Sequence, residues 1–293
     1  MTKIKFKKIA ITSTSKTKRI YEVASLCCEI LSNKGIEILL SKNLEKIKTD
    51  DLKVFSDKDI IKDADLILAV GGDGTMLSTA KVFGYHGVPV LGINLGKLGF
   101  LTDISPNELL ELMSEVLSGK YKVDNRGFLE AVISTSPKKL TAINEFVVHT
   151  GSIAKMIEFD VYVDDVFVYR LKADGIIVSS TTGSTAYSLS GGGPIIHPNV
   201  NAISLVPIFP HSLSSSPFVV SGESVIKIVL LKTSEPIRIS YDSEERKFKT
   251  KKEPITLTIS QSNNKLSLIH PNNHDFFEAC RNKLGWGMGI VKN

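Results

Sequence analysis

The periodicity of the apolar residues changes near residue 125, and this change constrains the fold more than any other feature of the sequence. Before it, short apolar runs alternate with segments whose apolar residues recur every three or four positions. That alternation is typical of strands and helices in an open, mostly parallel α/β sheet. After it, helical periodicity nearly vanishes, and short strand-like segments follow one another between turn residues. The sequence therefore predicts an α/β domain followed by a β-rich domain of layered sheets.

The predicted elements of the first part can be given by residue range. We predict strands at Lys8–Ser13, Ile36–Leu40, Leu66–Val70 and Val88–Ile93. We predict helices at Lys18–Lys34, Thr75–Phe83 and Pro106–Leu117, with Gly35 and Gly119 closing the first and the last. The run Leu66–Val70 is continuously apolar, which is the pattern of a buried parallel strand.

The second part reads as a series of strands. Ile157, Phe159 and Val161 alternate with charged or polar residues, which predicts a half-exposed strand, and Asp164-Asp165 forms a turn after it. Further strands are predicted at Phe167–Arg170, Gly175–Val178, Ala202–Pro207, Val225–Leu230, Ile237–Ser240, Ile255–Ser260 and Leu266–Ile269. Asp275–Leu284 returns to helical spacing, and we expect it to pack on the first domain. The expected domains are residues 1–124 with 271–293, and residues 125–270.

Composition narrows the function classes. The net charge of +5 permits anionic ligands such as nucleotides, but it is too small and too scattered to indicate DNA or RNA binding. Cys27, Cys28 and Cys280 form a poor disulfide framework, which favours a reducing compartment, and no Cys/His spacing resembles a zinc site. No apolar stretch has the pattern of a signal peptide or the length of a membrane span. We therefore expect a cytoplasmic protein.

The turn Gly71-Gly72-Asp73-Gly74-Thr75 is the sharpest candidate for a site. It follows a predicted buried strand and opens a predicted helix, and ligands of open α/β sheets bind at the carboxyl ends of strands. Glycines let a ligand approach the backbone, and the N–H groups at a helix start can hold phosphate. Asp73 would repel phosphate unless it binds Mg²⁺ or takes a proton. Taken alone, the same residues also suit an ordinary tight turn.

Two further groups of polar residues stand in the β-rich part. Residues 179–194 consist mostly of Ser, Thr and Gly, and that density of hydroxyl and N–H groups suits a ligand with many oxygens. Asn144-Glu145 lies inside an apolar stretch, where an amide and a carboxylate can read a polar edge of a ligand. Alone, the first group also fits a flexible loop and the second a solvent-facing strand end.

Together these motifs resemble the NAD kinase family. The resemblance rests on the turn at 71–75, on Asn144-Glu145, on Asp174-Gly175 with the run at 182–187, and on Gly92-Ile93-Asn94 followed by residues 98–103. They keep the order and spacing of the family over about residues 66–244. The turn itself is shared with lipid kinases and phosphofructokinases, whereas the combination is specific. The resemblance implies an α/β domain that binds nucleotide, a β-rich domain that binds NAD, and an active site between them.

The resemblance also implies the reaction and its residues. ATP and NAD would be the substrates, with Mg²⁺ held by donor phosphates and water and no protein ligand identified. Asp73 would be the general base that accepts the proton of the 2′-hydroxyl of NAD. The implied phosphate contacts are Gly71, Gly72, Gly74 and Thr75. The implied NAD contacts are Asp73, Gly74, Phe100, Asn144, Glu145, Lys155, Lys172, Asp174, Thr185, Ala186, Tyr187, Ser188, Leu189, Ser190 and Glu244.

Some positions depart from the pattern of the family. Lys172 replaces an arginine or a small residue, Glu244 replaces a common glutamine, and Ser216-Pro217 stands where many members have Arg-Pro. The sequence leaves open whether NAD or NADH is preferred and whether ATP or polyphosphate is the donor. The family usually forms homodimers or homotetramers, and no membrane or nucleic acid is implied. A diacylglycerol-type lipid kinase and a sensor that binds nucleotide without turnover are the alternatives.

Overall fold

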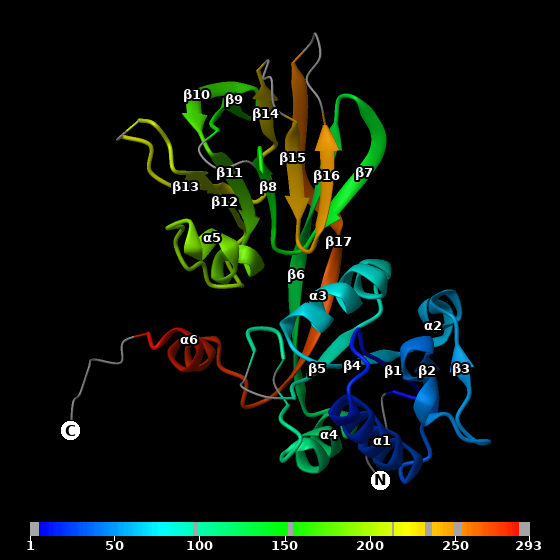
Figure 1. The fold of residues 1–293 in the computed structure, drawn as a ribbon. Coiled ribbons are helices and arrows are strands. Elements are labelled where there is room, and N and C mark those ends of the chain that lie inside the picture. The colour runs from blue at the N-terminus through cyan, green and yellow to red at the C-terminus, as the bar shows by residue number, and fades with distance from the viewer. Residues whose placement is uncertain are drawn as a thin grey trace. The chain divides into compact units, whose positions relative to one another are not determined.

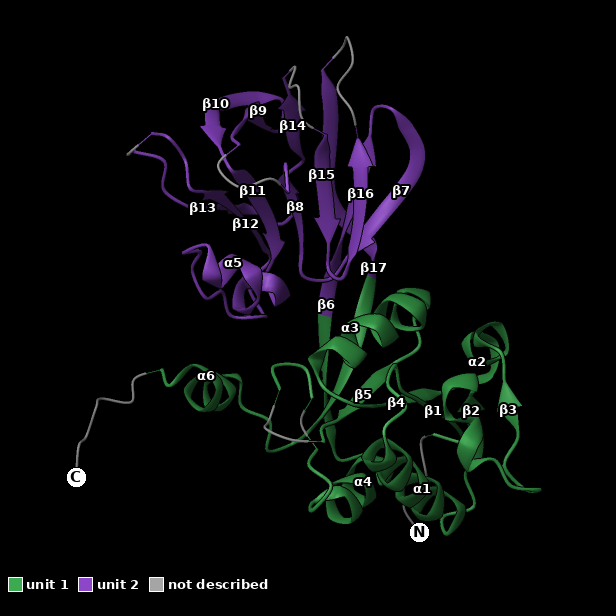
Figure 2. Cartoon of the chain, viewed as in Figure 1, with its two compact units in different colours: residues 1–125, 265–293 green, residues 126–264 purple. Residues whose placement is uncertain are grey.

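We describe the chain from a computed structural model, for residues 6–95, 99–102, 104–151, 155–212, 214–231, 236–248 and 254–286. The chain forms two compact units, residues 1–125 with 265–293 and residues 126–264 (Figure 2). We call them unit 1 and unit 2. Two long strands, β6 (Tyr121–Ile133) and β17 (Ile255–Pro271), carry the chain from one unit into the other.

Unit 1 is built on a parallel sheet, as the alternation of apolar runs predicted. Its order is β5-β4-β1-β2-β3, and the end of β17 adds a parallel pair beside β5 (Figure 1). All five residues of β4 are buried, because helices cover both faces of the sheet. The strands are β1 (Lys8–Thr12), β2 (Glu37–Ser41), β3 (Val54–Phe55), β4 (Leu66–Val70) and β5 (Val90–Ile93).

Side chains cap the first turn of two helices near the start of unit 1. Thr17 caps α1 by accepting from the N–H of Ile20, and Ser56 with Asp59 forms a capping box on α2. One face of the sheet packs on α1 and α4 in a single core that includes Ile11, Leu68 and Val23. The helices are α1 (Lys18–Ser32), η1 (Lys42–Ile47), α2 (Asp57–Asp63), α3 (Asp73–Val82), η2 (Gly84–His86), α4 (Leu109–Leu117) and α6 (Phe276–Leu284).

Unit 2 consists of two sheets with antiparallel pairing. One has the order β13-β12-β11-β8-β15-β16, and the other contains β10-β9-β14-β17 with β6 and β7 alongside. A core that includes Phe146, Phe159 and Ile228 lies between them, since alternate residues of each strand point inward. The remaining elements are β7 (Ser136–Ala142), β8 (Glu145–His149), β9 (Ile157–Val163), β10 (Val166–Ala173), β11 (Gly175–Ser180), η3 (Thr182–Thr185), α5 (Tyr187–Ser190), β12 (Ala202–Ile208), β13 (Phe218–Ser221), β14 (Ile226–Leu230), β15 (Ile237–Tyr241) and β16 (Glu244–Phe248).

The turn predicted at Asp164-Asp165 is confirmed. Both residues have positive φ, 51° and 63°, and together they connect β9 to β10 in an antiparallel hairpin. Asp tolerates this left-handed region better than most residues, and two successive positive φ angles match the twist of the hairpin.

Three sequence predictions differ from the structure. Ile255–Ser260 and Leu266–Ile269 are one continuous strand, because Asn263, Asn264 and Lys265 between them are exposed positions of β17 and not a turn. Helix α4 begins at Leu109, three residues after Pro106. Five strands and one helix were not predicted: β3, β6, β7, β13, β16 and α2. The sequences of β6, β7, β16 and α2 are rich in polar residues, and β3 and β13 are short. Among the described residues, no helix is both long enough and apolar enough to cross a bilayer.

Candidate active site

The order of the strands places the glycine turn at a switch point of the sheet. β2 and β3 lie on one side of β1, while β4 and β5 lie on the other. Ligands of open α/β sheets bind outside the carboxyl ends of the strands at such a point. Gly71–Thr75 follows β4 there, and Thr14 follows β1. The hydroxyl oxygens of Thr14 and Thr75 lie 2.8 Å apart and form a hydrogen bond. This bond joins the ends of β1 and β4 at the candidate site.

Gly71 is the glycine of this turn that has no space for a side chain, whereas Gly72 and Gly74 have open space beside them. A Cβ atom on Gly71 would overlap the side chain of Thr75. Gly72 is the N-cap of α3 and supplies no side-chain cap, and Gly74 in the first turn is exposed. The first N–H groups of a helix have no partner within the helix, and they favour negative charge. The turn therefore offers a backbone surface suited to phosphate oxygens.

Asp73 is held in place by the loop that follows β5. Its Oδ2 accepts the backbone N–H of Phe100 at 3.3 Å, and its Oδ1 accepts that of Leu101 at 3.2 Å. Lys283 Nζ of α6 donates to Oδ2 at 2.5 Å, and the same Nζ lies 4.8 Å from the centre of the Phe100 ring. The Asp73 side chain remains 29% exposed, so a hydroxyl group can reach its carboxylate.

A pocket of about 480 Å³ lies in unit 2. It brings together three of the residues predicted to contact NAD: Glu145, Asp174 and Tyr187. Carboxylate, hydroxyl and imidazole groups converge there beside apolar side chains, which is the usual composition of a small-molecule site. The other lining residues are Val147, His149, Thr150, Gly151, Ile208, Phe209, Ser240 and Asp242.

Glu145 is the most unusual titratable group of this pocket. It is only 6% exposed, and its Oε2 has no hydrogen-bond partner among the described residues. Burial, and secondly the charge of Asp242, raise the pKa of Glu145 to about 8. A buried polar atom without a partner is costly, so this oxygen is suited to a ligand that supplies one. At neutral pH the carboxyl is mostly protonated, and it can therefore donate as well as accept a hydrogen bond.

Asp242 and His149 complete the polar wall. Asp242 has a positive φ of 50°, and its carboxylate accepts the backbone N–H groups of Ile143 and Asn144. It thereby fixes the chain just before Glu145. His149 Nε2 lies 2.9 Å from Ser240 Oγ, and burial lowers the pKa of His149. The imidazole therefore lines the pocket in its neutral form at pH 7.

The other predicted contacts of unit 2 do not line this pocket. Asn144 precedes β8, and its carbonyl accepts from Ser180 N. Ser188 is buried, with its Oγ 3.4 Å from Ser204 Oγ, and Glu244 is exposed and accepts from Tyr241 Oη. Two of the remaining predicted residues, Lys155 and Lys172, are exposed. The others lie in η3, in α5 or between them: Thr185, Ala186, Leu189 and Ser190.

The sequence analysis did not predict several residues of the pocket, although the alternation of residues along a strand could have indicated some of them. Val147 and His149 lie on the same face of β8 as Glu145, since residues two apart in a strand share a face. Ser240 stands opposite Val147 in the register of β15 and β8. No pattern marks Lys283, because 210 residues separate it from Asp73.

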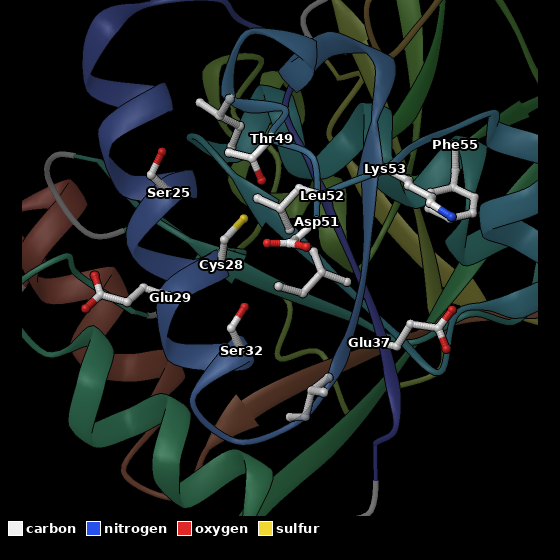
Figure 3. Close-up of a pocket in the computed structure, with 13 residues that line it drawn as sticks. Ser25, Cys28, Glu29, Ser32, Glu37, Thr49, Asp51, Leu52, Lys53 and Phe55 are labelled. Atoms are coloured by element: carbon white, nitrogen blue, oxygen red, sulfur yellow. The ribbon is translucent and has the colours of Figure 1, made fainter.

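A larger pocket of about 620 Å³ lies elsewhere in unit 1, between α1 and the β2–β3 edge (Figure 3). Ser25, Cys28 and Ser32 of α1 face it across from Asp51 and Leu52. Burial raises the pKa of Cys28 to about 11, so its thiol is not a nucleophile at neutral pH. None of the predicted site residues lines this pocket.

Comparison with known proteins identifies the family. Residues 9–121 match the ATP-NAD kinase N-terminal domain, and residues 143–271 match the ATP-NAD kinase C-terminal domain. An NAD kinase of Teredinibacter turnerae is 46% identical over 87% of this chain and 88% of its own. An NAD kinase of Blochmanniella pennsylvanica is 40% identical over 100% of this chain and 99% of its own.

Two solved structures share the fold. Yeast NADH kinase, crystallised with NADH, superposes with a TM-score of 0.87 at 25% identity, over 98% of this chain and 90% of that one. An Archaeoglobus fulgidus NAD kinase in complex with ATP superposes with a TM-score of 0.70 at 28% identity, over 95% and 97%. The two domain matches and the close relatives show that this chain belongs to the NAD kinase family.

Proposed function

We propose that this protein is an NAD kinase, a phosphotransferase that makes NADP⁺ from NAD and ATP. Its relatives carry that name, and the two structural neighbours were solved with NADH and with ATP. The observation that carries the proposal is the carboxylate of Asp73. It stands at the switch point of the sheet, oriented by two backbone N–H groups, on a turn suited to phosphate.

In the proposed reaction, Asp73 accepts the proton of the 2′-hydroxyl of the adenosine ribose. The freed oxygen forms a bond to the terminal phosphorus of ATP, and the bond from that phosphorus to its bridging oxygen breaks, which releases ADP. Phosphoryl transfer depends mainly on positioning and on neutralising charge. The backbone around Gly71, Gly72, Gly74 and Thr75 would hold phosphate oxygens, and Phe100 beside Asp73 would lie near the adenine.

We assign the pocket of unit 2 to NAD. Ribose hydroxyls can donate to Asp174, and Glu145 Oε2 offers the buried oxygen without a partner that a ligand hydroxyl would satisfy. Tyr187 is 48% exposed, and its ring offers a flat apolar surface to a base. The remaining predicted contacts in unit 2 stay part of the proposal: Asn144, Lys155, Lys172, Thr185, Ala186, Ser188, Leu189, Ser190 and Glu244.

The donor nucleotide would extend from the turn across the end of β1. A pocket of about 520 Å³ lies at the carboxyl ends of β1 and β2, lined by Thr12, Ser41, Lys42, Asn43, Ser56, Asp57 and Lys58. Neighbouring strands are about 4.8 Å apart, so β2 and β4 are separated by about 10 Å, which a triphosphate can span. Ser41 Oγ is buried there without a partner among the described residues, and the two lysines suit an anionic ligand.

Mg²⁺ would enter with the donor. Among the described residues, no three His, Cys, Asp or Glu side chains are grouped so that they can hold a metal ion. Mg²⁺ is commonly bound by substrate phosphates, water and one or two carboxylates, and here the donor phosphates and water would supply most of its ligands. The ion would neutralise charge on the phosphates. We also propose a cytoplasmic location, which the three free cysteines fit, and a homo-oligomeric state like that expected of the family.

One assay separates this function from its alternatives. Purified protein is mixed with NAD, ATP and Mg²⁺, and NADP⁺ is measured. Parallel reactions replace ATP by polyphosphate, NAD by NADH, or NAD by vesicles that contain diacylglycerol. We expect NADP⁺ with at least one donor and no phosphorylated lipid. Lipid phosphorylation without NADP⁺ would identify a lipid kinase, and nucleotide binding without either product would identify a sensor.

A further inference from the structure

The C-terminal helix brings a lysine onto the proposed base. Lys283 lies in the last turn of α6, and its Nζ contacts Asp73 Oδ2 at 2.5 Å and the Phe100 ring at 4.8 Å. The helix is fixed by its own contacts: Asp275 caps its start, Ala279 and Cys280 are buried, and the ring of Phe277 stacks on Trp286. The contact between Lys283 and Asp73 is therefore made by a structured element.

This contact competes with the role proposed for Asp73. Oδ1 already accepts the N–H of Leu101, and Oδ2 accepts both the N–H of Phe100 and the ammonium of Lys283. The two backbone donors orient the carboxylate. The ammonium takes the second acceptor position of Oδ2, so a substrate hydroxyl can approach Oδ2 only after Lys283 leaves it, and until then only the second position of Oδ1 is open.

The bound donor provides a reason for the lysine to move. ATP carries several negative charges, whereas Asp73 carries one, and the phosphate-binding turn begins immediately before Asp73. A lysine is a compact charge on a flexible stem, and both side chains are 29% exposed, so ligand can reach them. An ammonium that moves from Asp73 to a phosphate oxygen would neutralise charge on the transferred group and free the base in the same step.

We propose that Lys283 exchanges partners when the donor binds: it leaves Asp73 and holds a phosphate group of ATP. Lys283 is then a further catalytic residue, and it opens Oδ2 of the base only when the donor is present. This inference rests on the proposed function, because it assumes that the donor phosphates occupy the turn at Gly71–Thr75. It does not depend on which acceptor is phosphorylated.

Binding measurements without turnover test the exchange. Calorimetry with ATP and Mg²⁺ and, separately, with NAD is run on the wild type, Lys283→Met and Lys283→Arg. We expect Lys283→Met to weaken ATP binding about tenfold or more and to change NAD binding less than twofold. Lys283→Arg should recover part of the ATP affinity, since it restores the charge. The matched control is Arg281→Met on the same helix, whose guanidinium lies 3.5 Å from Asp275 instead, and it should bind ATP as the wild type does.

The outcomes are distinguishable from failure of the kinase assignment. Wild-type ATP affinity in Lys283→Met would overturn the exchange, even if the wild type makes NADP⁺. Equal losses of ATP and NAD affinity with a lowered melting temperature would show that Lys283 is only structural. If Lys283→Met fails to fold, Lys283→Gln is measured in its place. A wild type that binds ATP in this pattern but makes no NADP⁺ would refute the proposed function alone. In a structure with Mg²⁺ and ATP, Lys283 Nζ still on Asp73 Oδ2 would also refute the exchange.

Discussion

Glu145→Gln should change how the stability of the protein depends on pH. In the folded chain, burial and Asp242 raise the pKa of Glu145 to about 8, while the ordinary value is 4.5. Between these values the folded state holds a proton that the unfolded state has lost. Stability therefore falls as pH rises through this window. From pH 5 to pH 7 this one group lowers the free energy of unfolding by roughly 2.5 kcal/mol, which is the part of the linkage between the two pKa values that falls in this pH range.

Glutamine removes the titration but keeps the size and polarity of the side chain. We therefore compare the free energy of unfolding of Glu145→Gln with that of the wild type. Relative to the wild type, the variant should be roughly 2–3 kcal/mol more stable at pH 7 than it is at pH 5. Urea unfolding at pH 5, 6 and 7 measures this, since all other titrating groups are shared by the two proteins. Parallel pH profiles for the two proteins would refute the assigned environment of Glu145, and so would a larger advantage of the variant at pH 5.

Three other substitutions test separate parts of the account. Gly99→Ala would place a Cβ against Asp73 Oδ1 and Thr102 Oγ1. It should lower kcat at least about tenfold with a nearly unchanged melting temperature, because it displaces the carboxylate. An unchanged kcat would show that the loop adjusts freely. Lys58→Met should raise the KM for ATP several-fold and leave the KM for NAD unchanged, because Lys58 lines only the pocket assigned to the donor; an equal rise for both would contradict that assignment. Asp160→Asn removes a buried carboxylate that accepts two hydrogen bonds from Arg170, at 2.6 and 2.8 Å. It should lower the free energy of unfolding, measured in urea, by about 1–3 kcal/mol. An unchanged free energy of unfolding would show that this ion pair does not stabilise the fold.

The sequence predicted the elements in which local pattern and tertiary environment agree. Leu66–Val70 is apolar throughout because both faces of β4 are covered, and the predicted range matches the strand. The turn at Asp164-Asp165 was predictable because these residues tolerate positive φ. In contrast, β17 was divided in two, since the exposed polar residues in the middle of a long strand resemble a turn.

The candidate site was predictable only in part, for a physical reason. Asp73 and Glu145 lie in short motifs, so local sequence marks them. Asp242 reaches Glu145 in unit 2 from 97 residues away, and Lys283 reaches Asp73 in unit 1 from 210 residues away. The Ser-, Thr- and Gly-rich residues 179–194 also stabilise the fold more than their composition suggested. Ser180 Oγ donates to the carbonyl of Ile143, and Ser184 Oγ donates to that of Thr181, so several of these hydroxyls are occupied within unit 2.

The most direct measurement compares the wild type with Asp73→Asn in the same NADP⁺ assay, with the NAD affinity and the melting temperature of each. If Asp73 takes the proton, kcat should fall by about 10²–10⁴-fold, while the protein still folds and still binds NAD. An asparagine variant that forms NADP⁺ at nearly the wild-type rate would contradict the account, because no carboxylate would then be needed at that turn.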